Sequence, residues 1–304
     1  MKPTVLITGG SGFIGRALAL ALEAHAMVVR TSRSDGDFRG DLADAGFVRE
    51  LLARTRPDQI VHLAGATTHH EITTERTRSL QWGMAALDHL LLHWIPPHPE
   101  RAVFLFASSG KVYSPSPDPL TETSADHPTT LLGTMKRILE ERVRFASIGA
   151  DGVRYRIARV FNVYGPGQRK QFVVPAILHQ LRISSTIELG ELHHQRDPIF
   201  IDDLVTGLET ILRTSNPGSF DIYNVGSSQG ADVSDMLRVL EDLLGYRIDV
   251  RSNPARKRQY EATSELSNSD KLRAAGWLPR YDLRRGLIAT LKGTEGPWQA
   301  SLPS

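Results

Sequence analysis

The stretch TVLITGGSGFIG, residues 4–15, decides the fold of this chain. A short apolar run of strand-forming residues ends at Thr8, glycines follow at positions 9, 10, 12 and 15, and a segment with helical spacing continues beyond them. Strand, glycine-rich turn and helix in this order are typical of the first unit of a doubly wound sheet. The glycines allow a tight turn and let the backbone approach a pyrophosphate at the positive end of the helix. The context predicts a dinucleotide site at this turn.

The rest of the first half continues the alternation of strands and helices. Apolar runs predict strands at residues 5–8, 27–31, 59–63, 103–107 and 155–160, and helical periodicity predicts helices at 16–26, 45–55, 79–94 and 131–145. Continuously apolar strands joined by helices indicate a parallel sheet that is covered on both faces. Beyond residue 165 we expect helices at 173–181, 203–213, 233–244, 270–275 and 283–291, strands at 222–225 and 247–251, and a frayed tail from Gly293.

These elements predict an α/β fold, a doubly wound parallel sheet of the Rossmann type with a smaller C-terminal α/β substrate lobe. We assign residues 1–164 to the dinucleotide-binding domain, with residues 200–226 returning to it. Residues 165–199 and 227–304 then form the substrate-binding lobe. The ligand crevice is expected between the two parts, at the carboxyl ends of the strands.

Composition excludes several classes of protein. The chain has 304 residues, 36 Lys plus Arg against 34 Asp plus Glu, a net charge of +2, and no cysteine. Such a balance gives no basic footprint for nucleic acid, and the missing thiol excludes a disulfide scaffold, a thiolate metal site and a cysteine nucleophile. No apolar segment is long enough to cross a membrane. We expect a cytoplasmic protein without nucleic-acid or membrane partners.

The end of the second predicted strand, RTSRS at residues 30–34, bears on the choice of cofactor. A carboxylate there would accept a hydrogen bond from the ribose 2′-hydroxyl of NAD. None precedes Asp35, whereas Ser32 and Arg33 could hold the 2′-phosphate of NADP. We therefore favour NADP, with NAD as the alternative, and we place the Asp41-Leu42 dipeptide beside the adenine.

At this point the sequence resembles the extended short-chain dehydrogenase/reductases that act on nucleotide sugars. The motifs that carry the resemblance are GGSGFIG (9–15), DL (41–42), RPD (56–58), HLAG (62–65), SSGKVY (108–113), RVFNVYGPGQ (159–168), RD (196–197), DD (202–203), YNVG (223–226) and GWLP (276–279). They follow one another in the family's order and at its intervals over nearly the whole chain. The short length and the PARKR stretch at 254–258 look most like the GDP-6-deoxy-4-keto-mannose reductases.

The resemblance implies an NAD(P)-dependent enzyme whose substrate is a nucleotide-diphosphate sugar. Ser109 matches the catalytic serine or threonine, which hydrogen-bonds the reacting sugar oxygen, and Lys136 matches the lysine that binds the nicotinamide ribose. The implied cofactor contacts also include Gly9, Gly12, Phe13, Ile14, Gly15, Leu63, Ala64 and Gly65. The implied substrate contacts are Ser109, Asn162, Arg196 and Arg258. The family's usual homodimer, through helices 79–94 and 131–145, is a further expectation.

One position departs from the family's pattern, in which Tyr-x-x-x-Lys places a tyrosine four residues before the lysine. Here that place holds Leu132, in the run LGTMK at residues 132–136. None of the seven tyrosines has a lysine four residues later, so no shifted alignment restores the motif. Leucine cannot ionise or donate a proton, and the loss of general acid–base assistance commonly slows a reaction on the order of 10²–10⁴-fold.

Three interpretations of this departure stay open. A water molecule or another group could act as the acid, or the chemistry could need no proton transfer at that spot. Alternatively the chain could keep the pocket without the usual reaction, as a cofactor- or sugar-nucleotide-binding protein. We favour an enzyme whose reaction is 4-keto reduction, with epimerisation next. The alternative acids near Leu132 in the sequence are Tyr113, His127, Thr129, Thr130 and Thr134.

The remaining candidates receive simpler interpretations. His62, in the third strand, is interpreted as a packed structural histidine, and Trp277 as a packing anchor. His89 and His93 are spaced like metal ligands on a helix but lack a third ligand, so we expect no metal site. The His69-His70-Glu71 run follows the third strand on the side where ligands bind, which makes it a candidate for substrate contact. No Gly-x-Ser-x-Gly elbow is present, which argues against hydrolase chemistry.

Overall fold

The computed structural model describes residues 2–67, 69–150, 152–190, 192–216, 218–253 and 264–300. Within these residues seven strands form one parallel sheet in the order β11-β6-β5-β4-β1-β2-β3. The strands are β1 (Thr4–Thr8), β2 (Met27–Ser32), β3 (Phe38–Arg39), β4 (Gln59–His62), β5 (Val103–Ser109), β6 (Arg154–Val160) and β11 (Phe220–Val225). The order reverses at β1, between β2 and β4, and this reversal creates a crevice at the carboxyl ends of β1 and β4.

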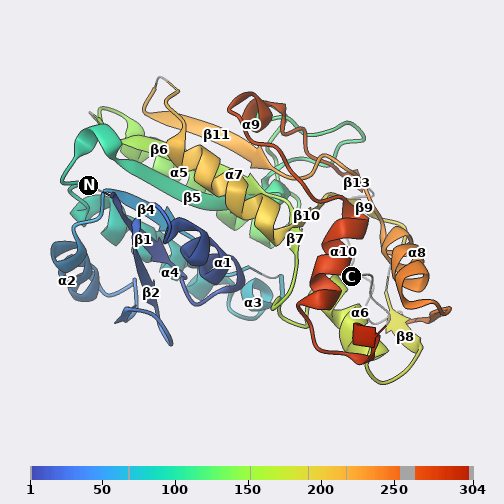
Figure 1. Ribbon diagram of the computed structural model, residues 1–304. Helices are drawn as coiled ribbons and strands as arrows, with labels where there is room; N and C mark the ends of the chain where they lie inside the picture. The colour runs from blue at the N-terminus through green and yellow to red at the C-terminus, as the bar shows by residue number, and fades with distance from the viewer. Residues whose placement is uncertain are drawn as a thin grey trace.

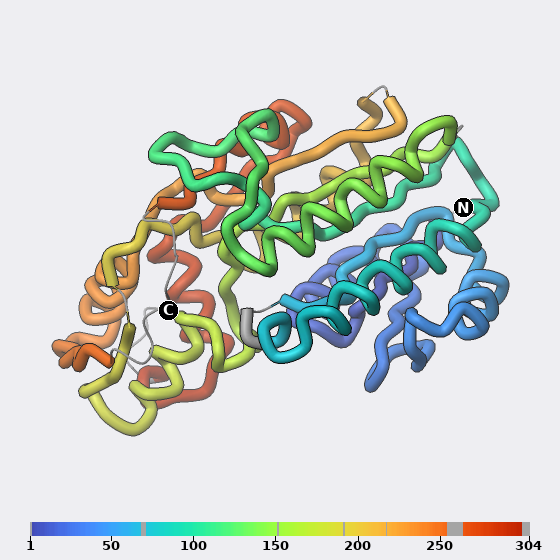
Figure 2. Tube along the Cα trace, turned by 180° about the vertical axis from the view of Figure 1, so that it is seen from behind, coloured from blue at the N-terminus to red at the C-terminus, as the bar shows by residue number. Residues whose placement is uncertain are grey.

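Helices cover both faces of this sheet, as the apolar strands predicted (Figure 1). One face packs against α1 (Phe13–Leu22) and α7 (Ile201–Arg213), and the other packs against α2 (Ala45–Thr55), α4 (Arg76–His93) and α5 (Leu131–Ser147). The tube in Figure 2 shows α4 and α5 side by side on the second face. The short elements of this half are α3 (His69–Thr74), η1 (Pro99–Arg101) and η2 (Gly110–Val112).

A smaller lobe follows, on the right in Figure 1. Its three strand pairs are all parallel: β7 (Asn162–Tyr164) with β10 (Pro198–Phe200), β8 (Thr186–Leu189) with β12 (Asp249–Ser252), and β9 (Gln195–Arg196) with β13 (Ser264–Glu265). The remaining helices are α6 (Val173–Leu181), α8 (Val233–Leu244), α9 (Asp270–Ala274), α10 (Leu283–Lys292) and η4 (Pro297–Ala300). The core that joins α6, α8 and α10 is continuous with the sheet face under α1 and α7.

Capping residues explain why several helices begin where the sequence predicted. The carboxylate of Asp44 accepts hydrogen bonds from the amides of Gly46 and Phe47, at 2.7 and 3.3 Å, and α2 begins after it. Asp232 and Asp235 form a reciprocal capping box at the start of α8. Each cap satisfies amide groups that the first helical turn leaves without partners.

Several predictions about elements were wrong. The first helix spans Phe13–Leu22 rather than residues 16–26, and it begins early because the turn delivers the chain into helix directly after Gly12. The sequence analysis missed the short helix α3 and the short strands β3, β7, β8, β9, β10 and β13. The tail from Gly293 is not frayed through the described residues, since Trp298 is 2% exposed and its indole N–H donates to the Leu291 carbonyl at 3.1 Å. No helix within the described residues has the length and apolar character needed to span a membrane.

Candidate functional site

The glycine turn after β1 is built by close backbone contacts. A Cβ at Gly9, where φ is +70°, would lie 2.9 Å from the amide nitrogen of Ala64, and a Cβ at Gly15 would lie 2.4 Å from the carbonyl oxygen of Gly9. At Gly12 the Gly9 oxygen, at 3.0 Å, is all that a Cβ would meet within 4 Å. Gly12 is the N-cap residue of α1, and no side chain hydrogen-bonds this cap. The first amides of α1, at Phe13 and beyond, therefore have no side-chain cap, and amides at the start of a helix are donors suited to a pyrophosphate.

Gly65 lies next to this glycine turn, beyond Ala64. It follows β4 with φ at +146°, and no atom lies within 4 Å of the position of its missing Cβ. Leu63 and Ala64 connect it to β1, because the Leu63 amide donates to the Thr8 carbonyl at 3.2 Å and the Ala64 amide donates to the Thr8 hydroxyl at 3.3 Å. The structure thus brings residues 9–15 and 63–65 together at the point where the strand order reverses.

The turn after β2 is organised by the hydroxyl of Ser32. This oxygen accepts from the amides of Ser34 and Asp35, at 3.3 and 3.0 Å, and donates to the Asp35 carbonyl. Arg33 is exposed at the tip of this turn. The Ser32 oxygen is therefore committed to the turn, and Arg33 is the group of this pair that remains placed to meet a phosphate.

Trp82, which the sequence analysis did not single out, hydrogen-bonds the residue that is predicted to contact the adenine. The indole N–H of Trp82, on α4, donates to Oδ1 of Asp41 at 2.6 Å, and the Ala43 amide donates to the same oxygen at 2.9 Å. His89, also on α4, has its Nδ1 3.0 Å from the Leu42 carbonyl oxygen. This bond gives His89 a structural partner. Among the described residues no group of three or more metal-ligating side chains occurs.

The predicted catalytic serine and lysine both lie near the carboxyl end of β5. Ser109 is the last residue of that strand, and its hydroxyl accepts from the Lys111 amide at 3.2 Å. Lys136 reaches across from α5 and donates from Nζ to the Ala107 carbonyl at 2.7 Å, with the ammonium 4.9 Å from the centre of the Phe106 ring. Burial lowers the pKa of Lys136 to about 8, although the Glu140 charge raises it.

A buried ion pair supports these two residues from inside the protein. Glu140, one helical turn after Lys136, accepts from Arg159 at 2.7 Å and from the Ser108 hydroxyl, and both charged side chains are 2% exposed. Arg159 also lies over the Tyr113 ring, 4.6 Å from its centre. The carboxylate is therefore shared between α5, β5 and β6, which fixes the helix that carries Lys136 against the strand that carries Ser109.

The groups near Leu132 do not supply an obvious substitute for a phenol. Tyr113 is 4% exposed and donates its hydroxyl to Asn224 at 2.6 Å, and burial raises its pKa to about 12. The Thr130 hydroxyl caps α5, and the Thr134 hydroxyl donates to the Thr130 carbonyl at 3.0 Å. The remaining two, His127 and Thr129, are exposed. Tyr113 is thus excluded as the acid by its burial and its bond.

His62 is a structural histidine, as predicted. Its ring is 2% exposed, hydrogen-bonds the Thr8 hydroxyl through Nδ1 at 2.7 Å and stacks on Phe106. Burial, together with the nearby Lys136 charge, lowers the pKa of His62 to about 3. The ring is therefore neutral at physiological pH and is not a proton donor to the crevice.

Two of the predicted substrate residues, Asn162 and Arg196, lie on the short strands β7 and β9. Asn162 begins β7 with an exposed side chain. Arg196 lies in β9, where its Nη1 donates to the Gln195 carbonyl at 2.8 Å and its Nε lies 3.8 Å from Oε2 of Glu265. Arg258 lies outside the described residues, as do the side chains of His69 and His70.

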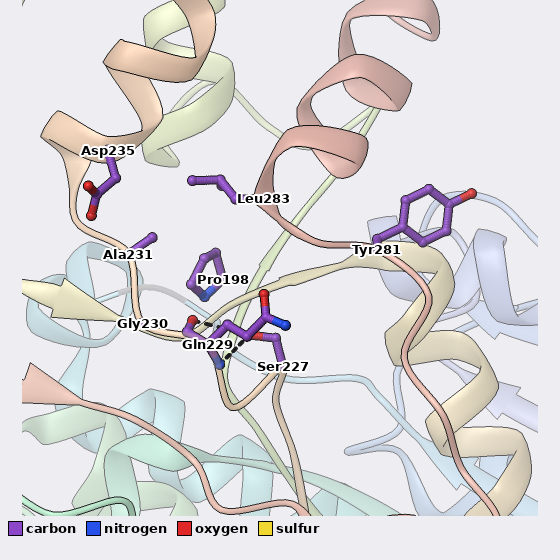
Figure 3. A pocket seen from close by; sticks show the side chains of 8 residues that line it. All are labelled: Pro198, Ser227, Gln229, Gly230, Ala231, Asp235, Tyr281 and Leu283. Atoms are coloured by element: carbon purple, nitrogen blue, oxygen red, sulfur yellow. Dashed lines mark hydrogen bonds between the residues drawn. The ribbon is translucent and has the colours of Figure 1, made fainter.

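Asp197, next to Arg196, anchors this side of the crevice. Its carboxylate is fully buried and accepts from the Ser227 hydroxyl at 2.6 Å and from the Ser267 amide at 2.9 Å. A pocket of about 200 Å³ lies beside Ser227, one of the residues that bind Asp197 (Figure 3). It contains none of the predicted site residues; its lining is Pro198, Ser227, Gln229, Gly230, Ala231, Asp235, Tyr281 and Leu283. Asp197 therefore stabilises the lobe rather than contacting a ligand.

We expect the pKa of Lys136 to be visible in cofactor binding. The affinity for NADPH should fall as pH rises through about 8, because the ammonium that would contact the ribose loses its proton there. A Lys136→Met variant should bind more weakly with no such step, in titrations from pH 6.5 to 9.5. An equal step in both proteins would contradict the assignment.

The pKa of Lys136 is lower in the folded chain than its ordinary value of 10.5. The contribution of Lys136 to the free energy of unfolding therefore becomes more favourable as the pH rises from about 8 to 10.5.

Several known proteins resemble this chain over most of its length. The model of the NAD dependent epimerase/dehydratase family matches residues 5–226. GDP-6-deoxy-D-mannose reductase of Pseudomonas aeruginosa is 26% identical, with 97% of this chain and 98% of that protein covered. UDP-glucose 4-epimerase of Azospirillum brasilense is 25% identical, with 99% and 93% covered.

Solved structures give the same result. RMD from Pseudomonas aeruginosa complexed with NADPH superposes with a TM-score of 0.83 at 25% identity, over 99% of this chain and 98% of that one. UDP-glucose 4-epimerase with UDP-glucose from Thermotoga maritima superposes with a TM-score of 0.82 at 22% identity, over 95% and 98%, which shows the shared fold. The family match runs from β1 to the end of β11 and takes in the glycine turn, Ser109 and Lys136. The chain belongs to the NAD dependent epimerase/dehydratase family, whose nucleotide-sugar epimerases, dehydratases and reductases are its relatives.

Proposed function

We propose that this protein reduces the 4-keto group of a nucleotide-diphosphate sugar with a nicotinamide cofactor, NADP(H) in preference to NAD(H). The observation that carries the proposal is the bond of Lys136 to the Ala107 carbonyl, two residues before Ser109 at the carboxyl end of β5, the same edge of the sheet as the glycine turn after β1. A GDP-6-deoxy-D-mannose reductase is among the relatives aligned over almost the full length of both chains, and this likeness supports reduction.

The residues present fit the cofactor. The first turn of α1, which has no side-chain cap, would hold the pyrophosphate, Asp41 the adenine and Lys136 the nicotinamide ribose. A reduced nicotinamide supplies the hydride for the ketone. The chain's own residues bind and orient, since the Ser109 hydroxyl would donate a hydrogen bond to the sugar oxygen and polarise the carbonyl.

The preference for NADP rests on the turn after β2. Arg33 is exposed there, and no carboxylate lies between β2 and Asp35. A guanidinium can donate two parallel hydrogen bonds to a phosphate. The related RMD structure from Pseudomonas aeruginosa was solved with NADPH, whereas another neighbour, the UDP-glucose 4-epimerase of Thermus thermophilus, was solved with NAD.

Arg196 and Asn162 are the substrate contacts we propose on the lobe. The Arg196 guanidinium suits a diphosphate. Arg258, outside the described residues, is proposed for the same role on the resemblance alone.

Leu132 favours a second candidate function, a sugar-nucleotide-binding protein with little catalysis. It lies in the first turn of α5, one turn before Lys136, where its partly buried side chain packs on the core beneath the sheet. A hydrocarbon at that place offers no proton. Epimerisation, the third candidate, is supported by relatives at similar identity.

We also propose a homodimer through α4 and α5. These helices and the residues that follow them expose large apolar side chains, which is unusual for a free surface. Sedimentation velocity would distinguish a dimer from a monomer. The exposed residues are Leu92, Ile95, Ile138, Phe145 and Ile148.

The decisive experiment follows NADPH absorbance with 4-keto-6-deoxy sugars carried on GDP, dTDP and UDP. We expect turnover with one of them, and a Ser109→Ala variant should be slower by about tenfold, since one hydrogen bond to the reacting oxygen is lost. Ser116, which lies in an exposed loop, provides the matched control as Ser116→Ala. Binding of NADPH without turnover of any of the three sugars would contradict the reductase proposal and favour the second candidate function, a sugar-nucleotide-binding protein with little catalysis.

A further inference from the structure

Lys111 lies between the predicted catalytic serine and the start of α5. Its amide donates to the Ser109 hydroxyl at 3.2 Å. Its carbonyl oxygen lies so close to α5 that a Cβ at Gly133 would be 2.0 Å from it. Gly133 follows Leu132 directly, so Lys111 adjoins both Ser109 and the helical turn where the family places its phenol.

The Lys111 ammonium points to the smaller lobe. It donates to both oxygens of Glu265 at 2.6 Å, and the two side chains are 21% and 15% exposed. Glu265 belongs to β13, which pairs with the strand of Arg196, and its Oε2 lies 3.8 Å from Nε of that arginine. The ammonium is therefore bonded to a carboxylate that also lies near Arg196, one of the residues proposed to contact the substrate.

The carboxylate that holds Lys111 is itself fixed. Glu265 lies two residues before Ser267, whose amide and hydroxyl donate to the buried carboxylate of Asp197. The strand pairing aligns Glu265 with Arg196, the neighbour of Asp197. Because the anchor is buried, Glu265 cannot drift away from the crevice without breaking these bonds.

Two other proton-bearing groups near Ser109 have other roles. Lys136 donates to the Ala107 carbonyl, under the Phe106 ring, and its remaining hydrogens are the ones proposed to bind the nicotinamide ribose; Tyr113 is buried and donates to Asn224. A lysine ammonium has three hydrogens, so Lys111 keeps one or more for a ligand after it has bonded Glu265.

We propose that Lys111 is the proton donor of the reduction, in place of the phenol that is absent at Leu132, and that Glu265 positions its ammonium. This inference rests on the proposed function. The carbonyl carbon accepts a hydride from the reduced nicotinamide, which is oxidised, and the C=O π pair moves to oxygen. An N–H bond of Lys111 breaks, its electron pair stays on nitrogen, and the O–H bond of the product alcohol forms. Water then returns the proton to the amine.

The variant that isolates proton donation is Lys111→Arg. A guanidinium keeps the positive charge and the pairing with Glu265, but it does not give up a proton in proteins. Turnover with NADPH and the 4-keto sugar should fall on the order of 10²–10⁴-fold, with the affinity for NADPH unchanged. Turnover equal to that of the wild-type chain would overturn the inference.

Rescue provides the second arm. In Lys111→Arg/Leu132→Tyr the added phenol takes the place that it has in the family, four residues before Lys136, and we expect turnover to recover by at least tenfold over the single variant. A merely structural role for Lys111 would not predict this recovery. Failure of the double variant to exceed the single variant, with both folded by circular dichroism, would count against donation from this place.

The third arm needs neither cofactor nor turnover. The wild-type chain is treated with limiting acetic anhydride, and acetylation of each lysine is measured by mass spectrometry. GDP-mannose, UDP-glucose or dTDP-glucose, whichever binds by calorimetry, should protect Lys111 at least threefold and leave the exposed Lys292 unprotected. A bound sugar nucleotide that leaves Lys111 fully reactive overturns this inference and leaves the proposed function standing. Absence of binding for all three, together with no turnover of any of the three 4-keto-6-deoxy sugars, would instead overturn the proposed function, and this inference with it.

Discussion

A Glu140→Ala variant is expected to lose about 3–5 kcal/mol of its free energy of unfolding. The substitution removes the carboxylate that accepts from Arg159 and Ser108 and leaves the guanidinium, 2% exposed, with only the partly exposed Asp126 carboxylate 3.4 Å away. A buried charge that has lost its main partner is costly because the interior cannot solvate it. Since folded domains are stable by about 5–15 kcal/mol, this change is large enough to unfold a substantial fraction of the protein in mild denaturant.

The matched control is the next residue of the same helix. Glu141 pairs with Arg137, but its side chain is 51% exposed, so Glu141→Ala should change the free energy of unfolding by about 1 kcal/mol or less. Urea titrations followed by circular dichroism measure both variants. Equal losses would mean that burial does not distinguish the two pairs. The Glu140 charge also raises the pKa of Lys136, so in Glu140→Ala the pH step in NADPH binding should move below pH 8.

Gly133→Ala is expected to slow turnover by about 10²-fold while leaving the helix itself intact. The new Cβ would lie 2.0 Å from the carbonyl oxygen of Lys111 and 2.8 Å from Cβ of Pro128. Because no such contact can persist, the start of α5 must move away from the turn that carries Ser109. A displacement of about 1 Å is enough to spoil a reacting geometry.

Gly83→Ala separates this effect from a general effect of alanine in a helix. Gly83 is a buried glycine of α4, but its Cβ would meet the end of the Leu139 side chain at 3.3 Å, and that chain can adjust. Both substitutions gain about 1 kcal/mol of helix propensity. We expect Gly83→Ala to retain turnover within threefold, and comparable losses in the two variants would contradict the proposed role of the close contact.

Local signals explain the parts of the fold that the sequence predicted well. Helices α2, α6 and α8 begin and end where periodicity placed them, and two of them start at an aspartate that caps the first turn. The apolar strands of the main sheet were also found, with ends displaced by one or two residues. The missed elements have a common cause, since α3 and the strands β3, β7, β8, β9, β10 and β13 are too short for either period to be recognised.

The parts of the site that were not predicted depend on contacts distant in sequence. Residues 9–15, Ser109 and Lys136 could be proposed from the sequence because each belongs to a local motif. The bonds of Trp82 to Asp41 and of Lys111 to Glu265 span 41 and 154 positions. Only the docking of α4 against the β3–α2 loop, and the pairing of β13 with β9, bring these groups together. No local pattern marks Glu265, which is why the partner of Lys111 emerged from the structure.

Because Trp82 is hydrogen-bonded to Asp41, binding of the cofactor is expected to change the tryptophan fluorescence of the protein. The chain has four tryptophans, and Trp94, Trp277 and Trp298 are buried at 7%, 1% and 2% exposure. Trp82 is partly exposed and touches the carboxylate proposed to meet the adenine. A ligand that arrives there changes the surroundings of this indole and leaves the other three untouched, so intrinsic fluorescence becomes a label-free gauge of occupancy. Nicotinamide mononucleotide, which has no adenine, should leave that emission unchanged.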